Sequence, residues 1–211
     1  MNIFKRITGG LCTLLLISSL FYGTAWAAGT VVFVSGTASA QRGSAVIPLS
    51  VNVQVKSGDV VQTGPASLLQ LRMDDGGLIS LKASSRLSLQ TYVAPVAGAQ
   101  SGGRAVLNLL KGGLRTLTGA IGSTNRDEYE LATPVATIGI RGTDYSVLYC
   151  DADCAQAPDG LHARVSRGAI LIRTLSGDEL LLRENEYAWI KDGSTAPSRG
   201  LEAPVEMSMV P

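Results

Sequence analysis

The stretch LATPVATIGIRGTDYSV, residues 131–147, contains the clearest pattern in this chain. Apolar residues occupy even positions from Ala136 to Ile140, whereas Tyr145, Val147 and the following Tyr149 occupy odd positions. Because side chains alternate between the two faces of a strand, this change of parity requires a bulge or a corner within residues 141–144. We therefore interpret the stretch as a strand corner, with Gly142 at a positive φ, rather than as an active-site loop or a partner contact.

The rest of the chain, from residue 30 onward, also alternates with a period of two. The sequence DDGG at 74–77 favours a hairpin turn between two such segments, because glycine accepts a positive φ without steric cost. Residues 106–119 could begin as a short helix, but Gly112 and Gly113 interrupt it, so we expect two strands joined by a glycine turn. Strands that recur at about ten-residue spacing predict an all-β protein, arranged as a compact sandwich or a short solenoid.

The first 27 residues have the pattern of a signal peptide. Lys5 and Arg6 precede an apolar run at 11–23, and AWA at 25–27 fits the small-x-small rule for cleavage after Ala27. The run is shorter than the roughly 20 residues of a membrane-spanning helix, so an uncleaved anchor is the weaker alternative. We therefore expect an exported protein, periplasmic or otherwise in the bacterial envelope, with no membrane span after cleavage.

We expect one all-β domain at 28–191, with a loop or sub-boundary at 94–104 and a flexible tail at 192–211. The tail is rich in Pro, Gly and Ser. Without Lys5 and Arg6 the chain has 16 basic and 17 acidic residues and is close to neutral. Because no basic stripe is visible, we do not expect a nucleic-acid partner.

Cys150 and Cys154 form the motif CDADC. In an exported protein such a close pair predicts a disulfide. The alternative is a metal site that adds Asp151, Asp153 or His162, but structural zinc sites take four nitrogen or sulfur ligands and the chain has one histidine. We therefore expect no metal, and we expect His162 to lie in a surface loop.

The chain has no clear sequence motif of a catalytic site. The sequence has no G-x-S-x-G element, and acidic residues cluster where turns are expected. A carboxylate pair for glycoside cleavage stays open, because such pairs assemble across strands. We expect a protein without enzymatic activity and without a cofactor.

Two segments resemble the FecR domain family: SGDVVQTG at 57–64 and TPVATIGIRGTDY at 133–145, with LLKGGLRTLTG at 109–119 between them. The resemblance extends over about residues 31–190. It assigns the family's core motif to Gly58, Asp59, Thr63, Gly64, Thr133, Pro134, Ala136, Ile140, Arg141, Gly142, Thr143 and Tyr145.

The resemblance implies an all-β periplasmic domain. In the founding members this domain belongs to an anti-sigma regulator that receives a signal from an outer-membrane transporter. No cytoplasmic helical region is visible here, so direct control of a sigma factor is not expected. We expect a non-catalytic envelope module that docks a sensor or an outer-membrane protein, with partner-binding residues and oligomeric state unknown. A structural or surface component, such as an adhesin or assembly subunit, is the alternative.

Overall fold

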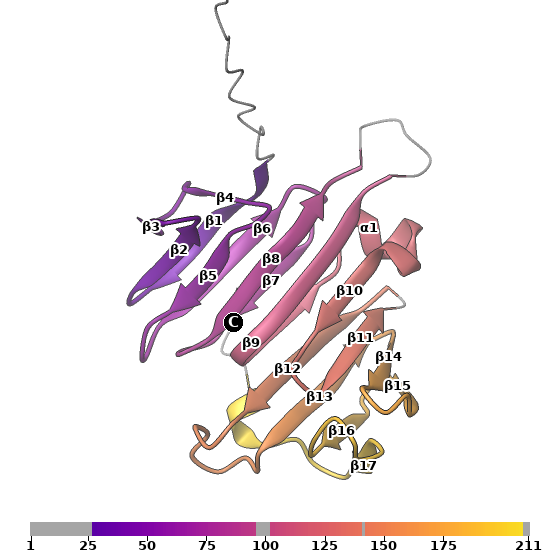
Figure 1. Cartoon of the computed structure of the whole chain (residues 1–211). Coiled ribbons are helices and arrows are strands. Elements are labelled where there is room, and N and C mark those ends of the chain that lie inside the picture. The colour runs from indigo at the N-terminus through magenta and orange to yellow at the C-terminus, as the bar shows by residue number, and fades with distance from the viewer. Residues whose placement is uncertain (1–26, 96–101, 141, 209–211) are drawn as a thin grey trace, which may run out of the picture.

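The computed structural model describes residues 27–95, 102–140 and 142–208, and these residues confirm the all-β prediction (Figure 1). The strands before the centre of the chain are β1 (Ala27–Ser35), β2 (Ala38–Arg42), β3 (Ala45–Pro48), β4 (Gln54–Lys56), β5 (Val60–Thr63), β6 (Leu68–Met73), β7 (Leu78–Leu81) and β8 (Arg86–Val93). The central strand β9 (Arg104–Leu117) is followed by the short helix α1 (Ala120–Thr124) and the 3-10 turn η1 (Arg126–Glu128). The remaining elements are β10 (Tyr129–Ala132), β11 (Ala136–Ile140), β12 (Asp144–Cys150), β13 (Gly160–Arg167), β14 (Ala169–Thr174), β15 (Glu179–Arg183), β16 (Tyr187–Ile190), β17 (Ser198–Gly200) and the 3-10 turn η2 (Val205–Met207).

The strands form two sheets that share β9. The first sheet has the order β4–β1–β6–β7–β9–β12–β13–β16–β17. The second has the order β3–β2–β5–β8–β9–β10–β11–β14–β15. Neighbouring strands are antiparallel, except that β9 and β10 are parallel. Strands β1–β8 therefore make one half of the molecule and β10–β17 the other, with β9 between them (Figure 1).

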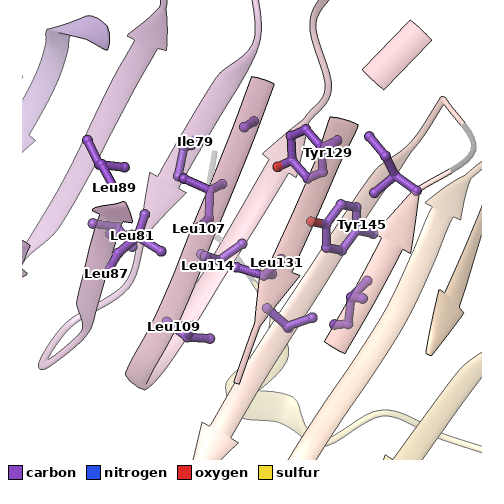
Figure 2. Packing of buried hydrophobic residues seen from close by; sticks show 14 of the residues in the cluster. Ile79, Leu81, Leu87, Leu89, Leu107, Leu109, Leu114, Tyr129, Leu131 and Tyr145 are labelled. Carbon is purple, nitrogen blue, oxygen red and sulfur yellow. The ribbon is translucent and has the colours of Figure 1, made fainter. Parts of the chain in front are cut away.

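The inward side chains of both sheets form one continuous hydrophobic core. Figure 2 shows Ile79 and Leu81 of the first sheet beside Leu87 and Leu89 of the second. Each of these side chains is at most 1% exposed, and each contributes about 1.5–3 kcal/mol through burial. The period-two pattern of the sequence is thus the pattern of two sheets that each bury one face.

Strand β9 joins the two sheets without a break, so the prediction of two strands with a glycine turn is wrong. Its first part pairs with β8 and β10 in the second sheet, and residues from Gly112 onward pair with β12 in the first. Gly112 has φ +75°, and a Cβ there would lie 2.7 Å from the Ser85 Cα. The Ser85 Oγ accepts a hydrogen bond from the Gly113 N–H at 2.9 Å. The two glycines therefore bend a single strand between the sheets.

The corner predicted within residues 141–144 is confirmed. Strand β11 lies in the second sheet and β12 in the first, and Ile138, Ile140, Tyr145 and Val147 all face the shared core. Gly142 has φ +67°. Arg141 lies outside the described residues. The change of parity in the sequence therefore marks the point where the chain passes from one sheet to the other.

The segment 192–208, which is the described part of the tail predicted at 192–211, contacts the domain. Strand β17 pairs with β16, and the Met207 side chain is buried against Leu148 and Cys150 on the outer side of the first sheet. The Lys82 Nζ donates a hydrogen bond to the Ser208 carbonyl at 3.2 Å. Residues 209–211 lie outside the described part of the chain.

Residues 1–26 of the predicted signal peptide also lie outside the described part of the chain. The expected loop at 94–104 is described only at its two ends. Within the described ranges, no helix has the length and apolar character needed to cross a membrane.

Candidate functional site

The first motif segment, around Gly58 and Asp59, builds the turn from β4 to β5. Gly58 has φ +89°, and the Asp59 carboxylate is fully buried. Both of its oxygens accept hydrogen bonds from Arg42, at 2.7 and 2.8 Å, and one also accepts the Lys56 backbone N–H at 2.8 Å. The hydrogen bond to Asp59 raises the pKa of Arg42. Asp59 thus connects β2 to this turn and takes no part in an open site.

Thr63 and Gly64 complete that segment at the end of β5. The Thr63 Oγ1 accepts a hydrogen bond from the Ser85 N–H at 2.9 Å and donates one to the Lys82 carbonyl. The Gly64 N–H donates to the Thr37 carbonyl at 2.8 Å. Both residues therefore connect the turns at one end of the sandwich.

The second motif segment builds the turns on either side of β11. The Thr133 Oγ1 donates a hydrogen bond to the Ala136 carbonyl at 2.8 Å, in the turn that contains Pro134. Beyond Gly142, the Thr143 N–H donates to the Thr118 Oγ1 at 3.0 Å. Among the described motif residues, Ala136, Ile140 and Tyr145 are buried in strands and the others lie in or beside turns and corners, so the motif does not converge on one pocket.

The predicted disulfide between Cys150 and Cys154 is present, with the two Cα atoms 5.6 Å apart. The bond lies at the start of the connection from β12 to β13, residues 151–159, which we name the disulfide loop. The Glu206 carboxylate accepts backbone hydrogen bonds from Gln156 and Ala157 in this loop, at 2.6 and 3.2 Å. Within the described residues, no group of three or more His, Cys, Asp or Glu side chains is arranged to hold a metal ion.

His162 is on β13 and fully buried, so the prediction of a surface loop is wrong. Its Nε2 donates to the Pro158 carbonyl at 2.7 Å, and its Nδ1 accepts the Tyr187 hydroxyl at 2.7 Å. The ring also stacks against Tyr187 and Trp189. Burial lowers the pKa of His162, and the Pro158 carbonyl and Glu206 oppose that shift. His162 faces outward from β13 under the disulfide loop, and its hydrogen bond to the Pro158 carbonyl anchors that loop to the sheet.

A groove lies on the outer side of the second sheet, over β11 and β14. It consists of two adjoining hollows of about 520 and 200 Å³ that share Arg126, Asp127, Gly139 and Leu171, and we name it the η1 groove. The other lining residues are Ser123, Thr124, Tyr129, Glu130, Thr137, Ile140 and Arg173.

Gly139 makes the floor of the η1 groove. It pairs with Glu130 on β10 and with Leu171 on β14. Gly139 has no side chain, so the space between the side chains of Glu130 and Leu171 is open. A Cβ at position 139 would meet only the Leu171 carbonyl oxygen, at 4.0 Å. Helix α1 and η1 supply one wall. The hollow therefore exists because a glycine lies in the middle of a paired strand.

The charges of the η1 groove are mixed. Arg126 and Asp127 lie in both hollows, and Glu130 and Arg173 line the smaller one. The Arg173 Nε donates to the Glu179 carboxylate at 2.8 Å, which holds that side chain at the rim. The sequence interpretation missed this groove. The available signal was Gly139 between two buried isoleucines, since glycine inside a strand often marks a close approach by another group.

The sequence model of the FecR protein family matches residues 59–171, which is more than half of the chain. The chain belongs to the FecR protein family. The match includes the strands that form the floor of the η1 groove. No curated protein sequence matches this FecR-family chain.

Two crystal structures of a candidate anti-sigma factor from Parabacteroides distasonis are similar to this FecR-family chain, each with a TM-score of 0.48 and 14% sequence identity. In both, the similarity covers 67% of this chain and 58% of the other protein. The chain thus matches little more than half of that protein's length.

Proposed function

We propose that this FecR-family protein is a non-catalytic module of the bacterial envelope that docks a protein partner in envelope signalling, and that the η1 groove is the docking site. The observation that carries the proposal is the position of the groove. It is built on β10, β11 and β14, and β11 is the central strand of the family motif. A sensor domain or an outer-membrane protein is the expected partner.

The composition of the groove supports a peptide segment as the occupant. Leu171 and the open floor at Gly139 provide an apolar centre, and Arg126, Asp127, Glu130 and Arg173 provide charges of both signs around it. Protein interfaces commonly combine an apolar centre with a polar rim. A segment with one apolar residue between charged residues would complement this arrangement.

Filling the groove tests the proposal. Gly139→Leu would place a side chain in the hollow without a backbone clash, because a Cβ there has only one neighbour, at 4.0 Å. A photo-crosslinking amino acid at Thr124, which lines the larger hollow, would report contact with a partner in intact cells. We expect specific crosslinks in the parent protein and their loss with Gly139→Leu.

Ser88→Leu is the matched control, because Ser88 lies on the outer side of the same sheet, on β8, two strands from β10. It should leave the crosslinks unchanged. Crosslinks of equal yield in the Gly139→Leu protein, or none in the parent protein under several growth conditions, would contradict the proposed site.

The free edges of the two sheets favour a second candidate function, as a structural or surface component. Among the described strands, β3 and β15 at the edges of the second sheet each pair on one side only. Such edges can pair with strands of other chains. Fractionation separates the alternatives: a soluble periplasmic pool is expected for the docking module, and an insoluble surface pool for the structural component.

A further inference from the structure

A continuous row of side chains crosses the outer face of the first sheet. The register of β1, β6, β7, β9, β12, β13 and β16 aligns one residue from each strand. In order, these residues are Phe33, Gln70, Ser80, Arg115, Ser146, Arg164 and Tyr187, and we name them the polar row. With about 4.8 Å between neighbouring strands, the row is about 29 Å long.

The polar row faces away from the core. Its sequence neighbours Leu69, Leu81, Leu114 and Val165 are buried in the core, so the row residues point to the opposite side of the sheet. The C-terminal segment and the disulfide loop cover the adjacent position Leu148 and pack against Tyr187, at one end of the row. The face over β6, β7, β9 and β12 is therefore accessible.

The side chains between the two ends of the row are all hydrogen-bonding groups. The Gln70 Nε2 donates to the Ser80 Oγ at 3.2 Å, and the Arg115 guanidinium donates to both Asp144 oxygens, at 2.9 and 2.7 Å. These contacts orient Gln70 and Arg115 within the row. Phe33, at one end of the row, is 46% exposed, so its ring is open to a ligand on this face.

Three more arginines give this face a positive charge. Arg164 belongs to the row, and Arg72 and Arg167 lie in the neighbouring row that contains Asp144. All three are exposed. Among the described residues, the ion pair between Arg115 and Asp144 is the one ion pair on this face. The guanidinium groups of Arg72, Arg164 and Arg167 are thus free to bind anions.

We propose that the polar row binds a linear acidic polysaccharide, such as a polyuronate, that lies across the strands. A pyranose residue is about as long as the spacing between strands, so successive sugars meet successive side chains. Arginine binds carboxylates in a bidentate geometry, and Ser and Gln exchange hydrogen bonds with hydroxyl groups. The exposed Phe33 ring would pack against the apolar face of a terminal sugar. This site is on the opposite sheet from the η1 groove and does not depend on it.

An acidic protein is the competing ligand class. Stable protein interfaces have an apolar centre, whereas the middle of the polar row, from Gln70 to Arg164, contains no apolar side chain. The regular spacing of hydroxyl, amide and guanidinium groups, one from each strand, fits a repeating polymer better than an irregular protein surface.

The test is calorimetric titration of the full chain with an oligogalacturonate of defined length, at low and high salt. The neutral cello-oligosaccharide of equal length and poly-L-glutamate are the comparison ligands. We expect binding to the oligogalacturonate, weakening with salt, and little binding to either comparison ligand. Arg164→Gln and Arg72→Gln should each weaken binding about tenfold, since each removes a charge-assisted hydrogen-bond donor.

Arg86→Gln is the matched control, because it removes an exposed arginine from β8 in the second sheet. It should leave the affinity within about twofold, and all variants should keep the parent melting temperature. No binding of the oligogalacturonate, equal binding of poly-L-glutamate, or a larger effect of Arg86→Gln than of Arg164→Gln would each overturn the proposal.

Discussion

The two halves of the molecule have the same architecture but opposite charge. Both consist of short strands that supply inward side chains from two sheets to one core. Residues 27–117 carry eight Lys and Arg against three Asp and Glu, whereas residues 118–211 carry eight against fourteen. The first part therefore has a net charge of +5 and the second a net charge of −6. The order of the strands places the two charges at opposite ends of the sandwich (Figure 1).

The opposite charges meet at the central strand. Arg104, Lys111 and Arg115 of β9 form ion pairs with Glu128, Asp153 and Asp144 of the acidic half, at 3.0, 3.1 and 2.7 Å. The basic partners are about half exposed, so each pair contributes little stability by itself. The continuous backbone of β9 and the shared core, rather than these pairs, are what join the halves.

The largest effect is expected where β9 crosses between the sheets. Gly112→Val combines a positive φ with a Cβ position 2.7 Å from the Ser85 Cα, so we expect a loss of about 4 kcal/mol in the free energy of unfolding. Urea denaturation followed by circular dichroism measures it. Because β9 belongs to both halves, the whole domain should lose stability together.

Gly142→Val is the control for that substitution. It has a similar φ of +67°, but a Cβ there would meet no atom within 4 Å, so the expected loss is about 2 kcal/mol. Equal losses at both positions would show that backbone conformation, and not the close approach of Ser85, decides the cost of a side chain at Gly112.

A smaller effect is expected for the ion pair of the basic half, in which the Asp59 carboxylate is fully buried and Arg42 is partly exposed. Asp59→Asn leaves Arg42 and the Lys56 N–H with a weaker acceptor, and we expect a loss of about 2–3 kcal/mol. Asp144→Asn removes the corresponding acceptor from Arg115 near the surface and should cost about 1 kcal/mol or less. Equal losses of unfolding free energy for the two variants in urea denaturation would show that burial of the carboxylate does not set the cost.

The disulfide should affect the acidic half alone. Replacing both Cys150 and Cys154 by Ser opens a short loop, so the expected loss is about 1–2 kcal/mol, at the low end for disulfides. Hydrogen exchange should become faster in β12 after Leu148 and in the segment that contains Met207, which contact the loop. Faster exchange in β5–β8 would show that the halves unfold as one unit.

The smallest effect is the pH dependence from His162. Its pKa is lowered by burial, so the unfolded chain binds the proton first as the pH falls below about 6.5. The free energy of unfolding should therefore decrease from pH 6.5 downward, because burial disfavours the charged ring and a protonated Nδ1 can no longer accept the Tyr187 hydroxyl. Since the chain has one histidine, His162→Gln should flatten the curve just below about pH 6.5, where the unfolded chain takes up the proton first. If the free energy of unfolding of His162→Gln depends on pH as steeply as that of the parent protein, the pH dependence comes from carboxylates instead.

Sequence reasoning succeeded where the signal is local. The alternation in residues 131–147 predicted the corner, and the spacing of Cys150 and Cys154 predicted their bond. It failed where one local signal has two structural meanings. Two successive glycines are compatible with a turn or with a bent strand, and the contact with Ser85, distant in the sequence, selects the bent strand in β9.

Two surfaces could not be predicted from the sequence because they depend on which strands pair and on which residues face each other across the pairs. The η1 groove needs β14 beside β11, and the polar row needs seven strands in alignment. His162 shows the same limit. Its position in the alternation indicates an outward side chain, but its burial comes from the disulfide loop and the C-terminal segment, which pack over the sheet.

The sequence by itself determined the all-β class, the parity change at Gly142, the disulfide and the opposite net charges of the two parts of the chain. These are properties of neighbouring residues or of composition. The tertiary structure alone decided which strands lie side by side, because pairing depends on contacts between distant residues and on a core that both sheets share. That pairing turned an uneven distribution of charge into two ends of one sandwich, and aligned seven separate side chains into a single row.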